Sequence, residues 1–185
     1  MAVNTVGSTI RIFDRLWVGG TYTFNANVAV TSPSWASRVS YNGGAADYNG
    51  TEIWVEQVTA ATGNQAVNVS YTDQGGAAGS TGAVGIAAAP SVARCWQLPL
   101  ASGDSGVQAI TNVTGSVATV GTFNVMVLRP IVDIYIAAGT TPIFNWADLA
   151  LPEIFNDSAL YCLIKSESGT AMGTVAPFDI TIANA

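Results

Sequence analysis

The residues that could do chemistry in this chain are few, and most of them are carboxylates. The 185-residue sequence has 12 acidic residues and no histidine. Without histidine, Ser-His-Asp and Cys-His catalysis is excluded, as are histidine-based metal sites. Paired carboxylates could still hydrolyse glycosides, because that reaction needs only two of them, roughly 5–10 Å apart.

Two pairs of carboxylates lie near each other in the sequence. Glu52 and Glu56 fall in a predicted strand, where a spacing of four residues puts them on one face about 13 Å apart. This separation is too large for glycoside hydrolysis, so we expect both on a solvated face. Asp148 and Glu153 flank a proline-bounded turn and could approach each other. A charged surface loop is the simpler interpretation of that second pair.

Metal, thiol and phosphate chemistry have little support. Asp73 and Asp104 sit in Gly-rich turns and could each supply one calcium ligand, but neither has a neighbouring carboxylate. An Asp in such a turn usually accepts hydrogen bonds from its own backbone. Cys95 and Cys162 form no CxxC motif, and Cys162 lies in an apolar stretch that predicts a small core residue. A disulfide between them stays open. No glycine-rich phosphate-binding motif is present. We therefore expect that the protein binds no cofactor and is not an enzyme.

The low content of charged residues limits the classes of partner that the protein could bind. Only 10% of the residues are charged and 49% are hydrophobic, whereas about 25% are charged in a typical soluble domain. The surface must therefore be mostly Thr, Ser, Asn, Gly and Ala, either on a weakly charged monomer or on a subunit buried against others. The net charge is -6 and the six basic residues are scattered. Direct nucleic-acid binding needs clustered positive charge, so we do not expect it.

Neither a secretory signal nor a membrane helix is predicted. Residues 1–9 contain no basic segment followed by an apolar one. The longest apolar stretch, Phe123–Ala138, is interrupted by polar residues that include Arg129 and Asp133. We expect the protein to be made and kept in a cytoplasm until it assembles.

Period-two alternation of β-branched and aromatic residues dominates the chain and predicts strands. Strands are expected at the following ranges: Ile10–Val18, Thr21–Val30, Glu52–Thr59, Gln65–Asp73, Val107–Val117, Phe123–Val127, Ile131–Ala137, Ala159–Lys165 and a segment around Ile180 and Ile182. Gly63-Asn64 predicts a tight hairpin. Gly19-Gly20, Asn42-Gly43, Asn49-Gly50 and Gly103-Asp104 predict other reversals.

The expected fold is all-β, an antiparallel β-sandwich or jelly roll with at most one short helical turn, at Asn145–Leu151. Residues 1–9 are expected to form an N-terminal arm and residues 10–185 a single domain. The small-residue segment Gly75–Pro90 is either a loop or contains a closely packed strand at Thr81–Ala87. Strand tryptophans such as Trp54 and Trp96 predict core packing. Phe144 and Trp146 lie in a loop and are candidates for contact with a partner.

The middle of the chain carries a resemblance. Residues Cys95–Ile110 contain an apolar "PLxxGDxGV" turn, and Gly121–Pro130 contain "GxFxVxxLRP". Together with Trp54-Val55-Glu56 and Tyr71-Thr72-Asp73, these motifs resemble virion structural proteins of tailed bacteriophages. The resemblance covers somewhat under half of the chain and is architectural rather than catalytic.

The resemblance implies a capsid decoration (cement) protein on the outer surface of the virion, bound to the major capsid protein. Such proteins are often β-sandwich or jelly-roll domains and commonly homotrimers. The uncharged arm Ala2–Thr9, with Val3, Asn4 and Val6, would then add a strand to a neighbour or remain a disordered terminus. A tail or fibre domain that binds a receptor or carbohydrate is the main alternative. An enzyme that degrades glycans with carboxylates is a weaker one.

Overall fold

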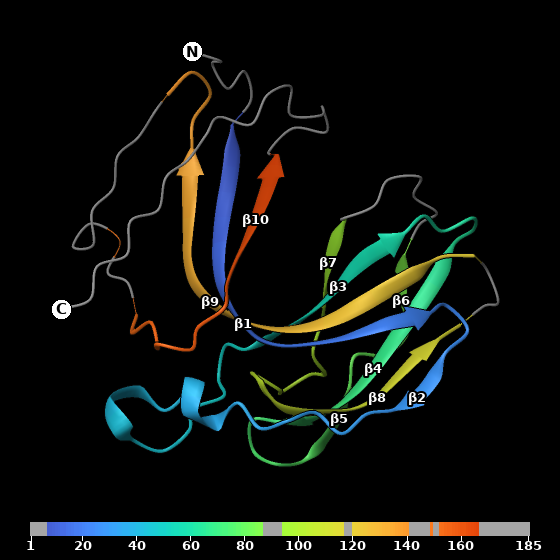
Figure 1. Ribbon diagram of the computed structural model, residues 1–185, viewed down its shortest axis with the longest axis horizontal. Helices are drawn as coiled ribbons and strands as arrows, with labels where there is room; N and C mark the ends of the chain where they lie inside the picture. Colours follow the sequence, from blue (N-terminus) through green and yellow to red (C-terminus); the bar gives the residue numbers. More distant parts are fainter. Residues whose placement is uncertain (1–6, 87–93, 117–119, 141–148, 150–151, 167–185) are drawn as a thin grey trace. The chain divides into compact units, whose positions relative to one another are not determined.

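The computed structural model describes residues 7–86, 94–116, 120–140, 149 and 152–166. These residues form ten strands and two short 3-10 helices (Figure 1). The strands are β1 (Ser8–Thr23), β2 (Asn27–Ala29), β3 (Glu52–Thr59), β4 (Gln65–Asp73), β5 (Ala78–Ser80), β6 (Val84–Ile86), β7 (Cys95–Leu98), β8 (Val107–Gly115), β9 (Thr122–Ile136) and β10 (Leu160–Ser166). The helices are η1 (Ala36–Arg38) and η2 (Tyr41–Gly43), where the sequence predicted none.

The strands form two sheets, as an all-β sandwich requires. The first has the order β10-β1-β9-β3-β7. The second has the order β2-β8-β4-β5, with β6 also paired to β4. The antiparallel registers include Trp54 opposite Met126 in the first sheet and Val69 opposite Val113 in the second. The predicted all-β fold is therefore confirmed.

The chain divides into two compact units. We call Phe13–Pro130 with Glu153–Leu160 the sandwich unit, and Met1–Ile12, Ile131–Pro152 and Tyr161–Ala185 the terminal unit. Strands β1 and β9 each run through both. Of the predicted arm, the structure describes residues 7–9, and Ser8 and Thr9 begin β1.

The core of the sandwich unit lies between its two sheets. Strand β4 alternates without exception between buried and half-buried residues, as one face packed on a core requires. Opposite it, β9 directs Phe123, Val125 and Val127 inward, and each is fully buried. Phe123 packs on Phe24 with a ring-centroid distance of 4.9 Å.

Two predicted turns are wrong. Gly63-Asn64 does not close a hairpin, because β3 pairs with β7 and β9 in one sheet whereas β4 lies in the other. Gly19-Gly20 does not reverse the chain, because both glycines lie inside β1. The chain instead turns at Phe24 and Asn25, which separates the predicted strand Thr21–Val30 into the end of β1 and the short strand β2.

Small residues of the Gly75–Pro90 segment form strands, not only a loop. Ala78–Ser80 and Val84–Ile86 both pair with β4. Close approach explains the choice of glycine at position 79, because a Cβ there would overlap the ring of Tyr71. The predicted helical turn at Asn145–Leu151 and the strand around Ile180 lie outside the described residues, apart from Leu149.

Candidate functional site

The residues proposed for an interface are not among those the structure describes. Val3, Asn4 and Val6 precede the first described residue, and Phe144 and Trp146 lie in the undescribed range 141–148. Their assignment stays a prediction. Asp148 lies in the same range, so the pairing considered for Asp148 and Glu153 is also untested.

The two carboxylates of β3 are each engaged in a hydrogen bond of their own. Glu52 and Glu56 share a face, as predicted, but they are half-buried rather than solvated, and Trp54 lies between them. The Trp54 indole Nε1 donates to Glu52 Oε2 at 2.7 Å. Asn124 Nδ2 donates to Glu56 Oε2 at 3.0 Å. The Asn124–Glu56 bond joins β9 to β3, whereas the Trp54–Glu52 bond lies within β3.

Trp54 itself has the predicted core role. It is 9% exposed and meets Phe13 edge to face, with ring centroids 5.7 Å apart. Trp96 is half-buried and packs against the core cluster. Trp54 is thus buried, whereas Trp96 remains partly accessible.

The two aspartates considered for calcium stabilise turns. Asp73 Oδ1 accepts hydrogen bonds from the backbone N–H groups of Gly75 and Ala77, both at 2.8 Å, which is the local bonding expected of an Asp in a turn. Asp104 Oδ2 accepts from the Tyr71 hydroxyl at 2.6 Å, and the same hydroxyl accepts from Ala101 N at 2.7 Å. Burial and the hydrogen bond to Asp104 raise the pKa of Tyr71 to about 12.

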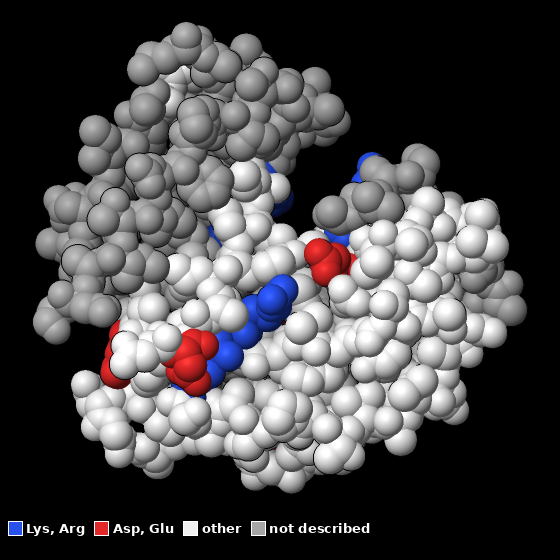
Figure 2. Space-filling model, in the orientation of Figure 1, with Lys and Arg blue, Asp and Glu red and all other residues white. Residues whose placement is uncertain are grey.

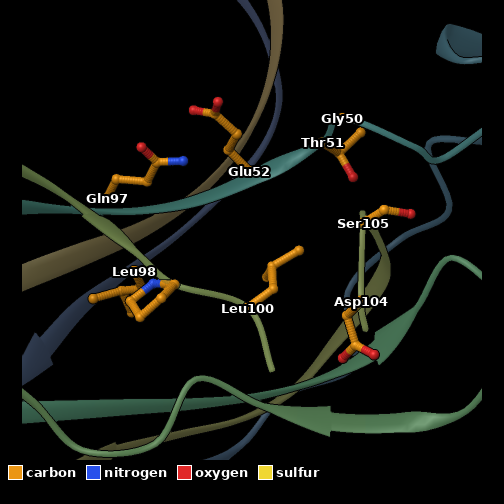
Figure 3. A pocket seen from close by; sticks show the side chains of 9 residues that line it. Gly50, Thr51, Glu52, Gln97, Leu98, Leu100, Asp104 and Ser105 are labelled. Atoms are coloured by element: carbon orange, nitrogen blue, oxygen red, sulfur yellow. The ribbon is translucent and has the colours of Figure 1, made fainter. Parts of the chain in front are cut away.

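A cleft of ≈ 320 Å³ lies beside this tyrosine–aspartate pair. It is lined by Gly50, Thr51, Glu52, Gln97, Leu98, Pro99, Leu100, Asp104 and Ser105. Figure 3 shows the Glu52 and Gln97 side chains extending in the same direction, whereas Asp104 points away from them. Its size is at the lower end for small-molecule sites, and its side chains are acidic, amide and apolar.

A buried ionic network in the sandwich unit was not predicted. Asp14, fully buried in β1, accepts hydrogen bonds at both carboxylate oxygens. Arg38 donates to both of them through Nε and Nη2. Arg129 Nη2 donates at 3.2 Å, Ser158 Oγ at 2.8 Å and Ala159 N at 2.9 Å. One carboxylate thus joins β1 to three segments distant in sequence.

Aromatic rings and carbonyl groups complete the surroundings of the two arginines. The Arg129 guanidinium lies over the rings of Phe155 and Tyr41, 5.1 and 5.5 Å from their centroids, an arrangement that stabilises a buried cation. Arg129 Nη1 also donates to the Glu153 carbonyl at 3.1 Å. Burial lowers the pKa of Arg38, Asp157 opposes this shift, and the charge of Arg129 adds to it.

The sequence did contain a signal for this network. Asp14 follows Phe13 in a strand predicted to be largely apolar, and Arg129 ends an apolar run. A charge inside such a strand must be paired when it is buried. Sequence spacing could not show the pairing, because Arg38 reaches Asp14 from the short helix η1 and Ser158 from a segment outside the strands. Asp14 is fully buried and Arg129 only 2% exposed, so the network has a structural role.

Cys95 and Cys162 do not form a disulfide bond with each other. Cys95 and Cys162 are each half-buried, and burial raises the pKa of Cys162. The prediction of a core position for Cys162 is therefore met only in part.

Within the described ranges, no cluster of three or more potential metal-ligating His, Cys, Asp or Glu side chains occurs. Nor does the same part of the chain contain a helix long and apolar enough to cross a membrane.

The described surface of the sandwich unit carries little charge. The network removes Asp14, Arg38 and Arg129 from the solvent. Figure 2 shows a face on which the described residues are mostly uncharged, with only a few basic and acidic side chains. The described part of this face is thus mostly uncharged.

Comparisons with protein-family models, with curated proteins and with solved structures found no match for this chain.

Proposed function

We propose that this protein is a virion structural subunit that binds the outer surface of a tailed-phage capsid, through the major capsid protein, and stabilises the assembled shell. The observation that carries the proposal is the scarcity of charge on the described surface of the sandwich unit. Soluble monomers usually rely on surface charge for solubility. Interface cores are depleted of charged residues, so such a surface suits burial against other subunits. The phage-like motifs of the sequence supply the class of partner.

The mechanism would be thermodynamic linkage. A protein that binds the assembled shell and not free capsid subunits shifts the equilibrium toward the shell. No reacting group is required for this role. A β-sandwich is suited to it, because little conformational entropy is lost when a preorganised surface binds.

Three measurements test the proposal. Light scattering coupled to size exclusion should show a homo-oligomer, for which we favour a trimer. Cosedimentation with empty tailed-phage capsids should bring the protein into the pellet, and micrographs should show added density on the capsid exterior. A strict monomer that binds none of a panel of such capsids would contradict the proposal.

A second candidate function is a receptor- or carbohydrate-binding domain of a tail or fibre, and the cleft is the observation that favours it. Carboxylate and amide groups beside apolar side chains, as with Glu52, Gln97 and Leu98, can orient sugar hydroxyls. Gln97 is exposed, so Gln97→Ala should remove any binding seen on a glycan array without disturbing the core. Binding that survives this change would place the ligand elsewhere.

A further inference from the structure

The two Asn-Gly dipeptides of the chain have the same local sequence but opposite surroundings. Both occur as Tyr-Asn-Gly, at Tyr41–Gly43 and at Tyr48–Gly50. Asparagine followed by glycine is chemically reactive, because glycine has no side chain to hinder attack by its backbone nitrogen on the preceding amide. Any difference in reactivity between the two sites must therefore come from the fold.

Asn49 is held by hydrogen bonds on every side. Its amide Nδ2 donates to Asp47 Oδ1 at 2.6 Å, and its Oδ1 accepts from the Ser105 hydroxyl. The nitrogen that would attack, Gly50 N, donates to the Ser105 carbonyl at 2.7 Å. Asn49 also forms a β-bridge with Gly106. Attack would require these bonds to break together.

The side chain of Asn42 has none of this support. It is exposed, and among the described residues its side chain makes no hydrogen bond. Its backbone lies in the left-handed region, with φ 52° and ψ 32°, which asparagine tolerates at some energetic expense. Gly43 follows at φ +69°, and a Cβ built there would meet nothing within 4 Å. Open space and two successive glycines leave the turn room to rearrange.

We propose that Asn42 is a site of spontaneous deamidation and that the fold protects Asn49. Gly43 N, after losing its proton to solvent base, attacks Asn42 Cγ. A Cγ–N bond forms, the Cγ–Nδ2 bond breaks, and ammonia leaves a cyclic succinimide. Water then opens the ring at either carbonyl, giving aspartate or isoaspartate. The net reaction consumes one water, releases one ammonia and oxidises nothing.

The position of Asn42 gives the modification a consequence for the network. Its backbone N–H donates to Glu153 Oε2 at 3.1 Å, and the adjacent Tyr41 lies against Arg129. Aspartate puts a second negative charge beside Glu153, and isoaspartate also lengthens the backbone of η2. Both products act on the turn that holds Tyr41 over the buried guanidinium.

The test is peptide mapping by mass spectrometry after incubation of the folded protein at mildly alkaline pH, with enzymatic labelling of isoaspartate. The Asn42 peptide should convert several-fold faster than the Asn49 peptide. In concentrated urea the two rates should converge, because both sites then present the same Tyr-Asn-Gly tripeptide without the fold. Equal rates in the folded protein, or faster conversion at Asn49, would overturn the proposal.

Two variants make the comparison specific. Asn42→Gln should abolish the fast product, and its persistence would show that another site reacts. Asp47→Ala removes the acceptor for the Asn49 amide and should accelerate conversion at Asn49 while leaving Asn42 unchanged. An unchanged Asn49 rate in this variant would contradict the protection we assign to these hydrogen bonds.

Discussion

At the scale of single residues, one carboxylate connects several parts of the sandwich unit. Asp14 accepts from Arg38 near the two short helices, from Arg129 at the end of the unit's part of β9, and from Ser158 in the returning segment. A buried ion pair contributes little net stability compared with apolar packing, but removal of one partner leaves an uncompensated charge. The role of Asp14 is therefore to specify how these segments meet.

Asp14→Asn should destabilise the protein by about 3–5 kcal/mol, because it leaves the buried guanidinium of Arg129 and the partly buried one of Arg38 without this carboxylate. Urea denaturation followed by tryptophan fluorescence measures the change. Asp133→Asn is the matched control: Asp133 pairs with Arg11 at 2.9 Å, and its side chain is 53% exposed. An exposed pair contributes at most about 1 kcal/mol. Equal losses in the two variants would show that the Asp14 network is not stabilised by its charge.

Tyr71 should make stability depend on pH in the alkaline range. Its pKa is raised to about 12, above the value of about 10 for an unfolded tyrosine. A group whose folded pKa is raised contributes its full stability below the unfolded value and loses it as the pH rises through the folded one. Stability should therefore fall between about pH 10 and about 12.

Tyr71→Phe should remove this part of the pH dependence. It should also lower stability at neutral pH by about 1–3 kcal/mol, because Ala101 N–H and Asp104 lose a buried partner. Denaturation at a series of pH values measures both effects. Tyr135→Phe, at a position 61% exposed, is the control and should change neither. An alkaline transition that survives in Tyr71→Phe would have to come from another group.

At the scale of elements, the positions of the strands were predicted from the sequence far better than which strands pair with one another. Glu52–Thr59 and Gln65–Asp73 were predicted with the boundaries they have, because alternation is a local property of the chain. Pairing is not local: β3 and β4 follow one another and yet belong to different sheets. The Gly63-Asn64 turn satisfies hairpin chemistry but says nothing about which sheet the next strand joins.

In the candidate site too, local features could be predicted from the sequence, whereas the contacts between distant segments could not. The cleft collects residues from the start of β3, the end of β7 and the turn before β8, so no continuous motif describes it. The Asp14 network combines β1 with β9, the helix η1 and the segment before β10, over separations as large as 145 residues. Sequence could flag Asp14 and Arg129 as charges in apolar strands, whereas their partners depended on the tertiary fold.

Close backbone contacts between elements predict that replacement by alanine will affect stability differently at two glycines. A Cβ at Gly106 would overlap the carbonyl of Tyr48, where the chain bridges Asn49 and Gly106, whereas a Cβ at Gly85 would meet nothing within 4 Å. Gly106→Ala should destabilise by about 1–3 kcal/mol through overpacking. Gly85→Ala in β6 should be neutral or stabilise by about 0.5–1 kcal/mol, because alanine loses less entropy in a strand.

Thermal denaturation of the two alanine variants measures the contrast, and the two melting temperatures should move apart. A Gly106→Ala protein as stable as the parent would mean that β8 and the turn before β3 can separate without loss. The cleft would then lie between elements that are free to move.

At the scale of the whole molecule, several charges of the described residues are already paired within the chain. The chain has 6 basic residues, and two of them, Arg38 and Arg129, are bonded to a buried carboxylate. Arg11 pairs with Asp133. Electrostatic steering depends on concentrated surface charge, which this arrangement does not provide. A partner would have to be bound mainly through apolar contacts and hydrogen bonds.

This leads to a prediction about ionic strength. If the protein binds capsids as proposed, the bound fraction should change little between low and high salt, because screening weakens only interactions between exposed charges. Cosedimentation across a salt series measures it. A strongly basic protein adsorbed to the same capsids is the control and should be released as salt increases. Release of this protein in parallel with that control would show that its attachment is electrostatic, and the scarcity of surface charge would then no longer support a buried interface.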